Sequence, residues 1–185
     1  MATFTRRAAL TTAVLAAGTA LAGCQSARPT SSSGDMSPDD LDFVANAYNI
    51  IEFDRQECVI AQTQARTSEV RALAAQLLQQ ANDFDERLRP IAASAGIKPP
   101  AVLRTDLRVR AGRLRLGQGL DFDRAFIDDQ IVSHQDALNL QEMVVSSPGT
   151  NPQLQALSRQ GTETIRTNLA KLQELQGRMR TMRRG

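Results

Sequence analysis

The sequence of 185 residues is poor in the side chains that build most catalytic and metal sites, with one histidine, two cysteines and no tryptophan. It contains no glycine-rich phosphate loop, paired-cysteine motif or nucleophile elbow. It also lacks stretches in which apolar and polar residues alternate as they do in strands. These absences argue against hydrolase or transferase chemistry and against a β-sheet fold, and no catalytic residue is predicted.

Residues 1–23 have the features of a bacterial lipoprotein signal peptide. Arg6 and Arg7 precede a short apolar segment, and small residues then lead to Cys24. The apolar segment has about 15 residues, fewer than the roughly 20 that a transmembrane helix needs. We therefore expect Cys24 to be lipidated and to become the mature N-terminus. Export by the general route and export by the twin-arginine route both remain open.

The predicted anchor also indicates where the protein resides. Residues 24–37 are rich in serine and cannot bury a core, so they are expected to form a lipidated, flexible tether. Glutamine at position 25 resembles lipoproteins that are sorted to the outer membrane of Gram-negative cells. The prediction is a cell-envelope protein, held by Cys24 on the periplasmic side, with the membrane as the partner that the sequence identifies.

The charge pattern does not favour nucleic-acid binding. The whole chain has a formal net charge of +2, but removal of the signal peptide takes away Arg6 and Arg7 and no acid, which leaves no net charge. Basic residues concentrate instead in residues 98–119, where arginines are interspersed with leucines. This segment is interpreted as a solvated basic strip, with a site for lipid headgroups or polyanions as the alternative.

Four segments repeat apolar residues at three- and four-residue spacing, which predicts amphipathic helices. They run from about 38 to 66, from about 68 to the glycine and prolines at 96–100, from about 121 to 146, and from about 152 onward. The predicted fold is all-α, a four-helix up-down bundle over residues 38–183, with one long crossover between the second and third helices. The crossover is expected to pack its leucines on the bundle, and it could include a short helix.

The lone histidine, His134, lies on the apolar stripe of the third predicted helix. Antiparallel helices joined by a tight turn place residues at equal height when these are equidistant from the turn. By this rule Asp54 faces Ala81, and His134 faces Asn168 across the turn at Asn151. All four positions are therefore expected to share one layer of the core.

This layer is predicted to be a core polar layer formed by Asp54, His134 and Asn168. An unpaired buried carboxylate is costly, so Asp54 is expected to bond the imidazole and the imidazole to bond Asn168. Cys58 falls on the same stripe as Asp54 and is expected to be a buried, inert thiol without a disulfide partner.

Several motifs resemble those of the secreted bacterial family known as domain of unknown function 4142. They are Phe43-Val44-x-x-Ala47, Val70-x-x-Leu73-Ala74-x-x-Leu77, Phe122-Asp123-Arg124-Ala125-Phe126, His134-Gln135-x-Ala137-Leu138 and Leu154-x-x-Leu157. The resemblance spans about residues 39–175 and implies a ferritin-like four-helix fold. It also implies a ligand set, since typical members carry glutamate at position 54, Asp-His at 80–81 and histidine at 168.

This chain keeps His134 but has Asp54, Gln80-Ala81 and Asn168 at the other positions. A transition-metal site generally needs three or four good ligands, and an amide is a poor substitute for imidazole. The predicted function is a non-enzymatic lipoprotein with a binding or structural role and no cofactor, whose ancestral metal site is lost. The alternative is a ferritin-like metal-binding or redox protein that uses His134 and Asp54, completed by Glu142 or Glu57.

Overall fold

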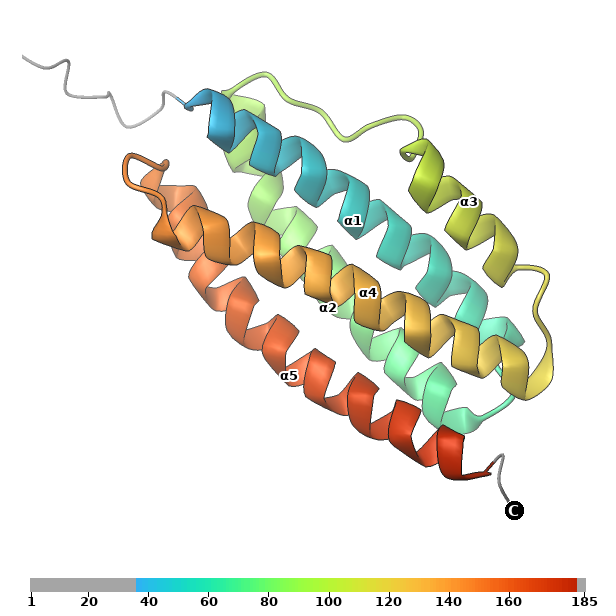
Figure 1. Ribbon diagram of the computed structural model, residues 1–185. Helices are drawn as coiled ribbons and strands as arrows, with labels where there is room; N and C mark the ends of the chain where they lie inside the picture. Colours follow the sequence, from blue (N-terminus) through green and yellow to red (C-terminus); the bar gives the residue numbers. More distant parts are fainter. Residues whose placement is uncertain (1–35, 183–185) are drawn as a thin grey trace, which may run out of the picture. The chain divides into compact units, whose positions relative to one another are not determined.

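The computed structural model describes residues 36–182, whose helices run side by side in Figure 1. The helices are α1 (Pro38–Gln64), α2 (Ser68–Ser94), α3 (Thr105–Leu114), α4 (Gly119–Ser146) and α5 (Pro152–Met182). No strand occurs among these residues, so the predicted all-α class is confirmed. The sequence predicted four long helices, and α3 is a fifth, short one. The predicted signal peptide 1–23 and Cys24 lie outside the described residues.

Local sequence determines where α1 begins. The Ser37 hydroxyl accepts a hydrogen bond from the Asp40 backbone N–H at 3.1 Å, and the Asp40 carboxylate accepts from the Ser37 N–H at 3.0 Å. This reciprocal capping box satisfies backbone donors that have no partner within the helix. Pro38 occupies the first helical position, where its missing N–H costs nothing.

Two buried aspartates fix the turns at opposite ends of the helices. Asp40 accepts from the backbone N–H of Asn151, in the turn between α4 and α5. Asp123, near the start of α4, accepts from the N–H groups of Arg66 and Thr67 at 2.8 and 2.9 Å. Because Arg66 and Thr67 form the turn between α1 and α2, Asp123 fastens that turn to the third long helix.

Asp123→Ala is expected to lower the free energy of unfolding by about 3 kcal/mol. The substitution leaves two backbone donors beside a fully buried position without their charged acceptor. Urea denaturation measures the loss. Asp136→Ala, at an exposed position on the same helix, is the matched control and should change stability by no more than about 0.5 kcal/mol. Equal effects of the two substitutions would contradict a fastening role for Asp123.

The segment between α2 and α4 carries α3, which packs on the outer side of α1 through a small cluster of Phe53, Leu103, Leu107 and Ala111. Arg110 secures this arrangement, because its guanidinium lies 4.7 Å from the centre of the Phe53 ring and pairs with Asp129 of α4 at 3.1 Å. Such a contact joins a cation to an aromatic face and to a carboxylate at once. Arg110, one of the arginines in the predicted basic strip, is therefore a structural residue.

One detail of the sequence prediction is wrong. Not every leucine of the crossover packs inward, since Leu116 is 83% exposed. Leu116 lies beyond the end of α3, so the helical spacing that buries Leu107 and Leu114 does not extend to it.

In residues 36–182 no helix has the length and hydropathy needed to cross a membrane.

The core consists of two apolar clusters separated by a polar zone. One cluster lies toward the turn between α1 and α2 and includes Cys58, Leu77, Phe126 and Leu172. The other lies toward the turn between α4 and α5 and includes Phe43, Ile51, Leu88 and Leu154. The predicted polar residues Asp54, His134 and Asn168 lie between the two clusters along α1, α4 and α5.

Candidate functional site

A cavity of about 350 Å³ occupies the polar zone between the two apolar clusters. Its wall includes Asp54 from α1, Ala81 from α2, His134 from α4 and Asn168 from α5. The structure thus brings to one cavity the four positions for which helix geometry predicted equal height. The Ala81 side chain is small and leaves part of this space open.

The cavity opens between α2 and α5. The exposed residues in its wall, Asp83, Arg87, Gln160 and Thr164, all belong to these two helices. A hydrogen bond from Arg87 to Gln160 crosses the opening at one end, and a bond of 2.7 Å from Asn168 to Gln80 crosses it at the other. Seven or eight residues separate these bonds on each helix, so the opening is roughly 10 Å long.

His134 is 6% exposed, and both of its ring nitrogens have partners. Nδ1 lies 3.0 Å from the carbonyl oxygen of Gln130, which can only accept, so Nδ1 carries the proton and donates. Nε2 lies 3.3 Å from the Asn168 amide nitrogen and accepts from it. The predicted bond between His134 and Asn168 is present in the structure, and it engages the lone pair that a metal would need.

Asp54 does not bond His134 as the sequence predicted. Its Oδ1 accepts instead from the Ser133 hydroxyl at 2.7 Å and from the Gln130 amide at 3.4 Å. Burial raises the pKa of Asp54, and this rise is opposed in part by the neighbouring His134 and by the bonds from Ser133 and Gln130. Ser133 is the better-placed donor because it is one residue from His134 on α4 and so faces α1 rather than α5.

Glu57 is a second buried carboxyl group in this zone, with 0% exposure. Its Oε2 accepts from the Gln130 amide at 3.0 Å, so one amide group bridges Glu57 and Asp54. Burial, then the charge of Asp129, raises the pKa of Glu57 to about 9, despite the opposing bond from Gln130. The carboxyl is therefore neutral near pH 7. From the sequence, Glu57 was predicted only as a possible metal ligand. The spacing of apolar residues along the helices did not indicate that Gln130 would face it.

Cys58 follows directly and lies in the apolar cluster beside this zone. It is a free, fully buried cysteine, and burial is the main cause that raises the pKa of its thiol, followed by Asp54 and Glu57. Since the thiolate is the reactive form, this environment disfavours redox and nucleophilic chemistry at Cys58.

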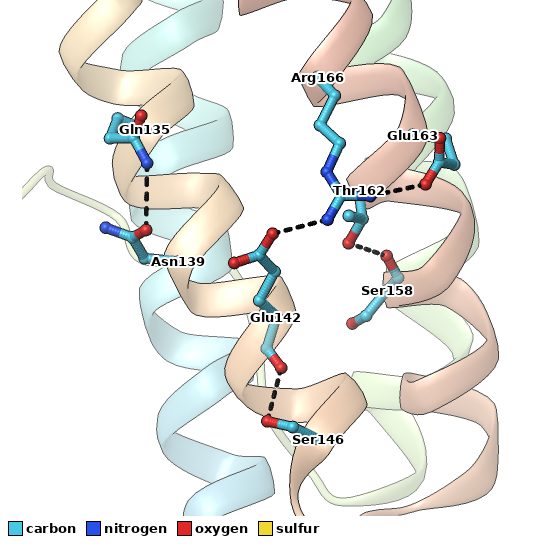
Figure 2. A network of polar contacts seen from close by, with 8 residues as sticks. All are labelled: Gln135, Asn139, Glu142, Ser146, Ser158, Thr162, Glu163 and Arg166. Carbon is cyan, nitrogen blue, oxygen red and sulfur yellow. Dashed lines mark hydrogen bonds and ion pairs between the residues drawn. The ribbon is translucent and has the colours of Figure 1, made fainter.

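Glu142 does not join the other predicted ligands. Figure 2 shows its carboxylate directed toward α5, where it pairs with Arg166 at 2.9 Å. Its side chain is 47% exposed, and it is absent from the wall of the cavity. The alternative ligand set of His134, Asp54 and Glu142 is therefore not assembled, because Glu142 lies two turns further along α4 and faces the surface.

Gln141, on the neighbouring face of α4, was not identified from the sequence as a site residue. It is buried and lines the cavity, and its Oε1 has no hydrogen-bond partner within the described part of the chain. The side chain fits because it lies against Gly161, where an added Cβ would be 2.1 Å from Oε1. The feature of the sequence that indicates this contact is Gly161, a glycine on the apolar stripe of the last helix.

The residues present do not fit a transition-metal centre. Both nitrogens of the one imidazole, that of His134, are hydrogen-bonded to protein groups. The Asn168 amide N–H is the donor to one of them. Among residues 36–182, no three side chains of the histidine, cysteine, aspartate and glutamate types are grouped so as to hold a metal ion. What the arrangement offers instead is an apolar cavity with a few buried hydrogen-bonding groups.

Fold and site together define an all-helical domain with an internal cavity beside a buried polar network. The chain belongs to the family described as domain of unknown function (DUF4142), whose model matches residues 25–175. A similar fold occurs in the crystal structure of a DUF305 fragment from Deinococcus radiodurans, with a TM-score of 0.69 and 16% sequence identity. The match covers 77% of this chain and 98% of that one, and at this identity it concerns the fold alone. No curated protein matches the sequence.

Proposed function

We propose that this protein is a lipid-anchored protein of the cell envelope whose helical domain is a non-enzymatic binding module. The observation that carries the proposal is the cavity of about 350 Å³ at the level of His134. Pockets of this size with mostly apolar walls and a few placed polar groups are typical of small-molecule sites. The polar groups there bond one another, and Cys58 is buried, which favours binding over chemistry.

The proposed architecture is a ferritin-like bundle of the four long helices α1, α2, α4 and α5, with α3 on a crossover between α2 and α4. The two apolar clusters and the turns fixed by Asp40 and Asp123 support this arrangement. In this proposal residues 1–23 are a signal peptide, 24–37 a lipidated tether and 38–183 the bundle. The anchor places the bundle on the periplasmic side, at the outer membrane.

Lipidation of Cys24 is tested by growing cells with an alkyne analogue of palmitate. The protein is expected to incorporate the analogue, and Cys24→Ser is expected to abolish the labelling. Cys58→Ser, which alters the other cysteine of the chain, should leave labelling unchanged. Label that persists in Cys24→Ser, measured by fluorescence in a denaturing gel, would disprove the anchor.

The second candidate is a metal-binding or redox protein of ferritin-like type. One observation favours it, namely that His134 and Asp54 line the same cavity. Metal analysis of the protein purified without a histidine tag separates the candidates. Substoichiometric metal is expected, because Asn168 already occupies the imidazole lone pair. One iron, zinc or manganese ion per chain, lost in His134→Ala, would establish the second candidate in place of the first.

A further inference from the structure

We propose that the cavity binds a small organic amine, with the ammonium group at the Asp54 end and an apolar body among the bundle side chains. This inference rests on the proposed function, because it names the class of ligand that the binding module would take. It follows from three features of the cavity: its apolar wall, its unpartnered acceptors and the sign of its buried charge.

The apolar part of the wall accommodates a compact hydrophobic group. Its main side chains are Phe43, Ile51, Leu77, Phe84, Leu140 and Ile165. A cavity of roughly 150 Å³ can hold benzene, so about 350 Å³ accommodates a body of roughly twice that size. A ring or branched chain of roughly a dozen non-hydrogen atoms, head group included, therefore fits.

Two hydrogen-bond acceptors in the wall of the cavity, one at each end, lack donors. Both hydrogen bonds to Asp54 reach Oδ1, and within residues 36–182 none reaches Oδ2. The amide oxygen of Gln141 is buried in the wall two turns further along α4 than His134, and within these residues it has no partner either. A buried acceptor without a donor is costly. A ligand whose N–H groups reach Asp54 would satisfy Oδ2, whereas one that brings only acceptors would not.

The buried carboxyl group of Asp54 favours a cation, because a positive charge beside it would stabilise its ionised form. The wall carries the charged residues Asp54, Asp83 and Arg87, and Asp54 alone among them is buried. Arg87 is exposed at the opening and bonds Gln160 there. An ammonium group would form a charge-assisted hydrogen bond with the buried carboxylate. An anionic ligand of equal size would face that carboxylate with no buried cation to offset it.

The test compares three probes on the full chain in lipid nanodiscs by calorimetry, with empty nanodiscs as the blank. 2-Phenylethylamine is the amine, propylbenzene is a neutral analogue of the same size, and 3-phenylpropionate is the anion. The amine is expected to bind at least about tenfold more tightly than propylbenzene, and the anion is expected not to bind. Asp54→Asn should bring the affinities for amine and propylbenzene close together. Ala81→Phe, which fills the cavity, should abolish binding of both.

Asp83→Asn is the matched control, because it removes a carboxylate at the exposed rim of the same cavity. It should leave the preference for the amine intact, and loss of the preference in this variant alone would place the amine at the rim and overturn the inference. Equal binding of amine and propylbenzene to the natural chain would also overturn it, while the binding module would stand. Failure of all three probes overturns the inference as well. The proposed function fails on a different result, stoichiometric metal in the purified protein.

Discussion

The free energy of unfolding is expected to fall as the pH rises from about 5 to about 9, by roughly 2–4 kcal/mol, and Glu57→Gln is expected to remove most of that fall. The cause is the raised pKa of Glu57, about 9 in the folded chain against an ordinary value of 4.5. Between these two values the folded protein holds a proton that the unfolded chain has lost. Stability therefore decreases with pH across this window and becomes independent of Glu57 above it.

Burial is the largest cause of the raised pKa of Glu57, and neighbouring groups modify it. Asp54 on α1 and Asp129 on α4 raise the pKa of Glu57, whereas Arg110 on α3 and the Gln130 amide lower it. Burial raises the pKa of Asp54 too, so Asp54 contributes a dependence of the same sign. Within the window, the raised pKa of Glu57 would lower the free energy of unfolding by about 1.4 kcal/mol for each pH unit. Rearrangement of the protein around the charged carboxylate reduces this loss.

Urea denaturation at several pH values measures the dependence. Glu57→Gln keeps the size of the side chain and cannot ionise, so its stability should fall by clearly less between pH 5 and 9 than that of the natural chain, and Asp54 accounts for the fall that remains. Glu52→Gln is the control, because Glu52 lies on the same helix but is only half-buried, and it should retain the slope of the natural chain. An unchanged slope in Glu57→Gln would show that another group holds the proton.

The helices and the level of the polar zone could be predicted because they follow local rules. The residues that cap α1 and α2, Ser37 and Thr67, are recognisable from a few neighbouring positions. Helical rise and tight turns then determine the heights of Asp54, His134 and Asn168. Since the height of a residue depends only on how far it lies from a turn, no knowledge of packing was needed.

The hydrogen-bond partners of the buried polar residues, and the cavity itself, could not be predicted in the same way. Asp54 bonds Ser133 and not His134 because α4 is rotated so that these adjacent residues face different helices. That rotation depends on the packing of all the helices together. The cavity likewise depends on side chains from four helices, and Glu142 turns to Arg166 because α5 places a guanidinium beside it. Such features are set by tertiary contacts that no single stretch of sequence contains.

Ala81→His combined with Asn168→His is expected to create metal affinity that the natural chain lacks. Both positions line the cavity with His134 and Asp54, so the variant would offer three imidazoles and a carboxylate. Asn168→His also removes the amide that now donates to Nε2 of His134, which frees that lone pair. Zinc at about 100 times its dissociation constant would stabilise the variant by about 2.7 kcal/mol. For a domain of this size, such a gain raises the melting temperature by roughly 5–10 °C.

Thermal melts with zinc and with a chelator test this expectation. The natural chain should melt at the same temperature in both, because its single imidazole is already bonded through both nitrogens. Adding His134→Ala to the double variant is the control and should abolish most of the zinc-dependent gain, since it removes one of three imidazoles. If the natural chain loses several degrees on chelation and the double variant gains nothing from zinc, His134 is already a working metal ligand. The network through Asn168 would then be a resting arrangement that opens when the ion binds.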